Sequence, residues 1–152
     1  MTTSEPTVTK RVVVGVDGSE ESKLALTWAA KIAQATVGYV EAVIAWQYPA
    51  TFGWAVPPSE WDPAQDADKA LVDAVDEVFG ANRPANLQLT VSEGYPANVL
   101  LTAAHGAAML VVGSRGHGGF AGMLLGSVSA NVAEHAQCPV LVVHPDPAAP
   151  SA

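Results

Sequence analysis

Short apolar runs and stretches with helical periodicity alternate along this chain of 152 residues. Valine-rich runs at positions 11–16, 39–46, 109–112 and 139–144 have the composition of strands buried in a parallel sheet. A further run at 87–91 alternates apolar with polar residues, so we expect a strand with a solvent-facing side or a place near the sheet edge.

Four segments between and after these runs carry helix signals. The first begins after Ser19, a residue type typical of N-caps, and acidic residues follow in its first turn. Asp62 and Pro63 have the residue types of an N-cap and of the first helical position. Two more helices are expected at 97–105 and from Gly126 to about position 137. The residues expected on the inward face of the first helix are Ala25, Trp28, Ala29 and Ile32.

The segment 47–61 shows neither the alternation of a strand nor the periodicity of a helix. It holds three prolines and four aromatic residues, and we interpret it as a surface crossover whose rings pack on the edge of the core. A lid or an interaction surface is the alternative interpretation.

This order of elements predicts the α/β fold class. We expect a doubly wound, five-stranded parallel sheet with strand order 3-2-1-4-5 and helices on both faces, a Rossmann-like architecture. One domain is expected over 10–145, with disordered ends at 1–9 and 146–152. Ligands of such sheets bind beyond the strand ends where the strand order reverses. Here that place lies between the first strand, ending at Val16 and Asp17, and the fourth, ending at Val112 and Gly113.

Composition narrows the possible partners. Apolar residues make up 49% of the chain, as in a globular domain, and the net charge of −8 argues against a nucleic-acid or anionic-membrane surface. No apolar run reaches the roughly 18 residues of a membrane span. The single cysteine, Cys138, excludes an internal disulfide. Because no secretory signal opens the sequence, we expect a cytoplasmic protein.

The stretch 109–129 carries the candidate chemistry. A strand-like run leads into Gly113, Gly116 and three further glycines, and Gly126 precedes a helix. Glycine allows backbone amides to turn toward a ligand, and the first amides of a helix have no internal partners, so this arrangement predicts a phosphate site. Ser127 and Ser129 add hydroxyl groups. A mobile surface loop is the plainer alternative. The stretch 109–129 is not a Walker A loop, because no Gly-Lys-[Ser/Thr] follows its glycines.

The spacing G-x2-G-x9-G-S resembles the nucleotide-binding signature of the universal stress protein family, in its ATP-binding branch. The opening VVVGVDGSEES, the turn GYPA and the closing CPVLVVH are also similar to that family. The resemblance implies that Asp17 approaches the ribose and adenine end and that backbone near Val43 faces the adenine. The complete set of predicted nucleotide-binding residues is Val16, Asp17, Val43, Val112, Gly113, Arg115, Gly116, His117, Gly126, Ser127, Val128 and Ser129.

We therefore expect an ATP-binding regulatory or stress-response module rather than a fast enzyme. A nucleotide is an anion, so positive potential is expected from backbone amides, Arg115 and a bound Mg²⁺. No catalytic or metal-ligating residue is assigned, because neither a Walker-type lysine nor a second carboxylate lies near the loop, and at most a weak ATPase is expected.

Other functions stay open. An AMP- or cyclic-AMP-binding module uses the same site, and a slow ATP hydrolase of the related adenine-nucleotide α-hydrolase type is a second alternative. A flavodoxin-like carrier is disfavoured, because its phosphate loop follows the first strand. For assembly, we expect a homodimer through the last strand, since an unpaired edge is a liability. The residues of that strand are Val140, Leu141, Val142 and Val143.

Overall fold

The computed structural model describes residues 10–48, 60–116 and 125–145. Strands and helices alternate strictly within these residues, and every strand pair is parallel, in the order β3-β2-β1-β4-β5. The predicted fold class and strand order are therefore confirmed. The elements are β1 (Arg11–Gly15), α1 (Glu20–Ala35), β2 (Tyr39–Trp46), α2 (Pro63–Phe79), β3 (Gln88–Glu93), α3 (Pro96–Ala103), β4 (Met109–Gly113), α4 (Ser127–His135) and β5 (Val140–Val143).

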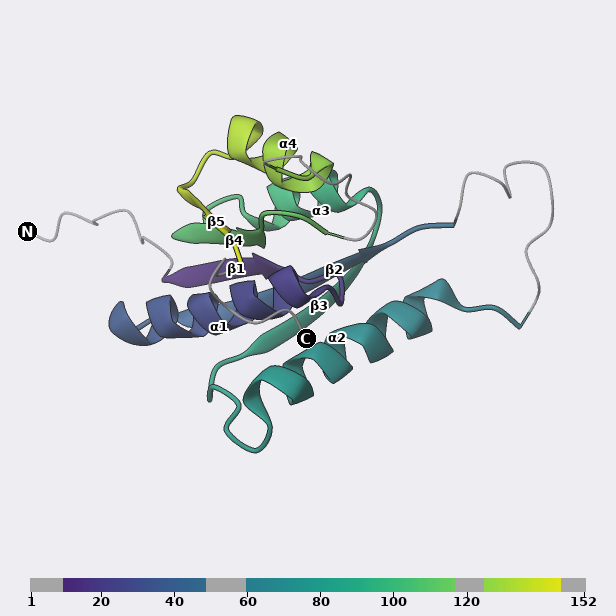
Figure 1. Ribbon diagram of the computed structural model, residues 1–152, viewed down its shortest axis with the longest axis horizontal. Helices are drawn as coiled ribbons and strands as arrows, with labels where there is room; N and C mark the ends of the chain where they lie inside the picture. The colour runs from purple at the N-terminus through teal and green to yellow at the C-terminus, as the bar shows by residue number, and fades with distance from the viewer. Residues whose placement is uncertain (1–9, 49–59, 117–124, 146–152) are drawn as a thin grey trace, which may run out of the picture.

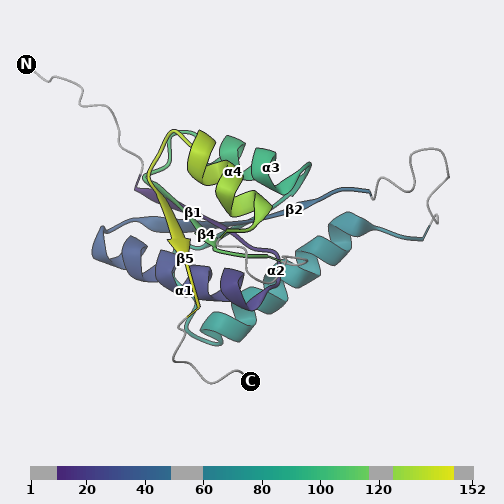
Figure 2. The ribbon, with the colours of Figure 1, turned by 45° about the horizontal axis from the view of Figure 1, so that its top comes forward.

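Two pairs of helices enclose the sheet (Figure 1). Helices α1 and α2 cover one face, while α3 and α4 cover the other, and the turned view of Figure 2 shows the same layers. One core cluster joins the first helix pair to side chains such as Val12, Val14 and Val111, and the other joins the second pair to Val13 and Leu110. Because both faces are covered, the central strands β1 and β4 read as continuous valine-rich runs.

The inward face of α1 differs from the prediction at one position. Trp28 is 44% exposed, and its ring lies beneath the Lys31 ammonium at 5.2 Å, whereas Leu26 is fully buried. The helix packs closely on β1 and β4 through small side chains, so a large indole ring fits only on the rim of this contact. The buried residues of α1 are Ser22, Ala25, Leu26, Ala29 and Ala33.

The predicted cap of α2 is present. Asp62 Oδ1 accepts hydrogen bonds from the backbone N–H groups of Ala64 at 3.1 Å and Gln65 at 3.2 Å. The ring of Tyr48 contacts the rings of Trp46 and Trp61 edge-on, with centroids 5.7 and 5.6 Å apart. At these described ends of the crossover the rings contact one another, with Tyr48 45% exposed and Trp46 packed against the core, while 49–59 lie outside the described residues.

Strands β3 and β5 form the two edges of the sheet. The β3 side chains are half-buried or exposed, which confirms its expected place at an edge. Within residues 10–48, 60–116 and 125–145, no helix is long and apolar enough to cross a membrane.

Candidate functional site

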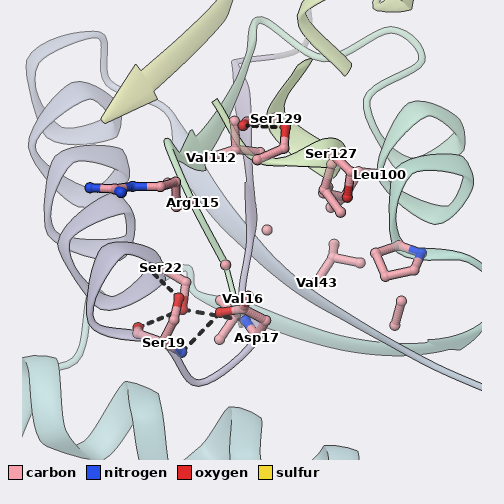
Figure 3. Close-up of a pocket in the computed structure, with 17 residues that line it drawn as sticks. Val16, Asp17, Ser19, Ser22, Val43, Leu100, Val112, Arg115, Ser127 and Ser129 are labelled. Atoms are coloured by element: carbon pink, nitrogen blue, oxygen red, sulfur yellow. Dashed lines mark hydrogen bonds between the residues drawn. The ribbon is translucent and has the colours of Figure 1, made fainter. Parts of the chain in front are cut away.

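A crevice of about 370 Å³ opens where β1, β2 and β4 end (Figure 3). This volume lies within the roughly 300–1,000 Å³ of ordinary small-molecule sites. It is also the point where the strand order reverses, as the sequence predicted. His117 lies outside the described residues. Every other predicted site residue lines the crevice, namely Val16, Asp17, Val43, Val112, Gly113, Arg115, Gly116, Gly126, Ser127, Val128 and Ser129.

Hydrogen bonds fix the turn between β1 and α1 at one wall of the crevice. Gly18 has a φ of 83°, a conformation that residues with a side chain rarely adopt. Asp17 Oδ1 accepts a hydrogen bond from the Ser19 backbone N–H at 2.9 Å, and Ser19 Oγ accepts one from Ser22 N–H at 3.2 Å. Ser22 Oγ in turn accepts from the Asp17 N–H at 3.3 Å. The Asp17 carboxylate is therefore held at the N-terminus of α1.

Two of the motif glycines make close contacts across this wall, Gly116 with a side chain and Gly113 with backbone atoms as well. A Cβ on Gly116 would overlap the Asp17 carboxylate. A Cβ on Gly113 would lie 2.7 Å from Glu21 Cβ and 2.9 Å from the Glu21 carbonyl carbon. The sequence assigned Asp17 to the sugar and base end of a nucleotide, yet its carboxylate also lies against the glycine loop. The glycine spacing thus has a packing cause in addition to any contact with a ligand.

The N-terminus of α4 faces the crevice from the opposite side. Its N-cap is Gly126, which supplies no side-chain cap, so the first amides of the helix have no side-chain acceptor from that position. Ser127 is exposed and lines the crevice. The Ser114 carbonyl accepts both the Gly126 N–H at 2.6 Å and the Ser129 hydroxyl at 2.8 Å, which ties the two ends of the glycine loop together.

This geometry gives the two predicted serines different roles toward a ligand. The Ser129 hydroxyl is buried and donates its proton to a carbonyl, so the residue offers a ligand its backbone amide rather than its side chain. Ser127 offers both its backbone amide and a side-chain hydroxyl at the crevice.

The formal charges around the crevice are few. Among the described lining residues, Arg115 is the one cation and Asp17 the one carboxylate. Figure 3 shows the Arg115 side chain directed away from Val43 and Ser127, over α1. Positive potential inside the crevice therefore comes mainly from backbone amides and the α4 dipole. Within the described parts of the chain, no group of three or more histidine, cysteine, aspartate or glutamate side chains is arranged to hold a metal ion.

Part of the crevice lining is apolar. The Val43 side chain is buried there, and its carbonyl accepts the Val16 N–H at 2.9 Å while keeping a second lone pair. Sequence reasoning missed six lining residues. A signal existed for Gly15, which directly precedes the predicted Val16, whereas Leu100 joins the lining only because α3 packs on β1 at Gly15. The missed residues are Gly15, Ser19, Ser22, Ala45, Pro96 and Leu100.

Comparisons with known proteins match most of the chain to one family. A family model described as "Universal stress protein family" matches residues 9–144. Universal stress protein Rv2005c of Mycobacterium tuberculosis is 35% identical over 156 residues, which cover 95% of this chain and 51% of that protein. Universal stress protein Rv3134c of the same species is 34% identical over 154 residues, covering 97% of this chain and 53% of that protein. The chain thus spans about half the length of the curated relatives it matches.

Solved structures share the fold of this chain. UspA from Lactobacillus plantarum matches with a TM-score of 0.69 and 24% identity, covering 91% of this chain and 99% of that one. A universal stress protein in complex with cAMP matches with a TM-score of 0.66 and 30% identity, covering 92% of this chain and all of that one.

Proposed function

The chain belongs to the universal stress protein family, and from that premise we propose that its crevice binds an adenine nucleotide and that the protein acts as a regulatory module. One observation carries the proposal. A crevice of ligand size is lined both by apolar side chains and by the N-terminus of α4, which has no side-chain cap. A nucleotide has matching groups, a flat base and phosphates joined through a sugar.

The apolar side chains and the α4 N-terminus suggest one orientation for the nucleotide. The base would enter the slot beside Val43 and Leu100, where a flat apolar ring removes the most surface from water. The phosphates would accept hydrogen bonds from the first amides of α4 and from the Ser127 hydroxyl. Asp17, which is held at the N-terminus of α1, would lie between the nucleotide base and the phosphates and accept a hydrogen bond from a ribose hydroxyl.

A Mg²⁺ ion fits this arrangement only as a companion of the phosphates. Mg²⁺ commonly keeps several waters and is held by one or two carboxylates plus phosphate oxygens. The described lining supplies the single carboxylate of Asp17, and one of its oxygens already accepts the Ser19 N–H. An ion shared with Asp17 would take the place of the ribose contact and would neutralise phosphate charge near a carboxylate.

The described residues favour binding over turnover. Hydrolysis needs a base or a positioned water at the terminal phosphate and a cation on the developing charge. The Asp17 carboxylate is engaged at the α1 cap, and the Arg115 side chain lines the crevice but extends away from Ser127. We therefore propose that bound ATP is held rather than rapidly hydrolysed, and that occupancy is passed to a partner surface.

Titration calorimetry with ATP, AMP and cyclic AMP tests the proposal. We expect at least one of them to bind, and Ser127→Ala to weaken it through loss of a hydroxyl donor. Ser92→Ala, on the edge strand β3 and outside the crevice lining, is the matched control and should bind like the wild type. The proposal fails if a folded wild-type sample binds none of the three nucleotides, or if the two variants weaken binding equally.

Cyclic AMP is the second candidate ligand, because a solved relative of 30% identity is described as a complex with cAMP. Mass spectrometry of the freshly purified protein distinguishes the candidates by the nucleotide released on denaturation. ATP in the released fraction supports the ATP-binding branch, and cyclic AMP supports the alternative. A time course of ADP formation in the same preparation measures any slow hydrolysis.

We further propose a homodimer through β5. This strand pairs with β4 on one side and ends the sheet on the other, and Val140, Leu141 and Val142 are half-buried. Light scattering at micromolar concentration should give twice the monomer mass. Dilution should then raise hydrogen exchange at β5 amides and leave the opposite edge strand β3 unchanged. A monomeric mass, or equal changes at both edges, would contradict this interface.

A further inference from the structure

Resting on the proposed function, we propose that Leu100 sets the depth of the base slot, so that the site accepts an unsubstituted purine and excludes bases with bulky ring substituents. Leu100 lies on α3, is 5% exposed and lines the crevice together with Val43. In Figure 3 its side chain lies on the same side of the crevice as Val43 and opposite Arg115. It is the largest apolar side chain in the lining.

Leu100 packs directly on the floor of the slot. A Cβ on Gly15 would lie 2.7 Å from Leu100 Cδ1 and 3.2 Å from Cδ2. The leucine therefore reaches the backbone of β1, and it does so because residue 15 has no side chain. No gap remains between Leu100 and the sheet into which its side chain can retreat.

Helix α3 is also held at both ends, so the wall is fixed. Before its N-terminus, the Gly94 N–H donates to the Trp46 carbonyl at 2.8 Å. After its C-terminal turn, the Arg11 guanidinium donates to the carbonyls of Ala103 at 2.6 Å and His105 at 3.0 Å. A cation at this end also suits the helix dipole. Outward movement of α3 would break these contacts.

The Arg11 side chain is itself anchored to the sheet. Its guanidinium pairs with Glu41 at 2.8 Å, and Glu41 accepts the Thr90 hydroxyl at 3.0 Å. The chain of contacts runs from β3 through β2 to the end of α3. Because these contacts hold α3 in place, the length of the side chain at position 100 determines how far a base enters the slot.

The slot selects by shape because its described side chains offer no polar group. Val43, Ala45, Pro96 and Leu100 are all apolar. A hydrophobic pocket rejects an extra group mainly through lack of space, and one methylene of misfit changes affinity about 10–200-fold. Shortening residue 100 should therefore relax selectivity more than it reduces affinity for the parent nucleotide, because a cavity left by a leucine can admit an apolar group.

Calorimetric titration of four proteins tests the inference: wild type, Leu100→Ala, Leu100→Val and the control Leu101→Ala. Leu101 is a half-buried leucine on the same helix outside the crevice lining. The probes are ATP, N6-benzyl-ATP and 2-methylthio-ATP, or the corresponding cyclic AMP analogues if cyclic AMP is what the wild type binds. The measured quantity is the ratio of each analogue's Kd to that of the parent nucleotide.

We expect this ratio to fall about tenfold or more for at least one analogue in Leu100→Ala, by less in Leu100→Val, and not at all in Leu101→Ala. Unchanged ratios in a folded Leu100→Ala protein, or an equal fall in Leu101→Ala, would overturn the inference while leaving nucleotide binding intact. If circular dichroism shows Leu100→Ala unfolded, Leu100→Val decides the test by the same criterion. A wild type that binds neither parent nucleotide refutes the proposed function, and the inference with it.

Discussion

Replacing Gly113 by alanine should destabilise the fold even when no nucleotide is bound. Gly113 ends β4 at the floor of the crevice, and its missing Cβ faces the first turn of α1. An added methyl would lie 2.7 Å from Glu21 Cβ, 2.9 Å from its carbonyl carbon and 3.0 Å from its carbonyl oxygen. Two of these atoms belong to the backbone, so a side-chain rotation cannot relieve the contact.

The size of the effect follows from two opposing terms. Overpacking a tight contact costs about 1–3 kcal/mol. Alanine also restricts the unfolded chain, which returns up to about 1 kcal/mol. We therefore expect the free energy of unfolding to fall by about 1–2 kcal/mol. Nucleotide affinity should fall as well, because the displaced turn carries Asp17 and Ser19 at the crevice wall.

Urea denaturation without nucleotide measures this loss. With a slope of about 2 kcal/mol/M, the midpoint should drop by roughly 0.5–1 M. Ser127→Ala is the contrast, because it alters an exposed side chain and should stay within about 0.5 kcal/mol of the wild type while affinity falls. An unchanged midpoint for Gly113→Ala, together with lost nucleotide binding, would refute the packing argument and leave Gly113 with a role at the ligand alone.

Three further results are expected. Arg11→Ala should lower the free energy of unfolding by about 2–3 kcal/mol in urea titrations, because it leaves the partly buried Glu41 without its cation; Arg11→Lys should recover only part of this. The Glu77 carboxylate raises the pKa of Lys23 above its ordinary 10.5, so the pair stabilises the fold below that pH and the contribution is lost as the pH rises through the raised value. A Lys23→Met protein should then lose less stability than the wild type between neutral and strongly alkaline pH. Burial raises the pKa of the Cys138 thiol, so iodoacetamide at mildly alkaline pH should alkylate the native protein more slowly than the urea-unfolded chain, and equal rates would contradict the assigned burial.

Local signals predicted the elements well because their causes are local. The cap at Ser19, the Asp62 and Pro63 start of α2 and the valine-rich strands each depend on residues within a few positions. The error at Trp28 has a different origin. Helical periodicity gives the direction of a side chain within about one residue, but the neighbouring elements decide which residues at the border of the apolar face have space.

The crevice was predicted in part for a similar reason. Strand order and the glycine spacing identified the segments ending at Asp17 and Gly113, because the reversal point of a parallel sheet follows from the order of elements. The contribution of Leu100 has no local signal, since a leucine in a short helix reads as core. Its place in the lining depends on α3 crossing β1 at Gly15, some 85 positions earlier in the chain.

The sequence by itself determined the fold class, the strand order, the helix caps and the segments that meet at the end of the sheet, because composition, period and turn chemistry act over short distances. The tertiary structure alone decided which glycines and serines of the motif have packing roles and which face the crevice. Gly113 leaves space for the backbone of Glu21, and the Ser129 hydroxyl donates a hydrogen bond to the Ser114 carbonyl. Ser127 remains exposed at the crevice. These roles depend on which atoms packing brings within a few ångströms, and residues of the same type in one motif give no sign of that difference.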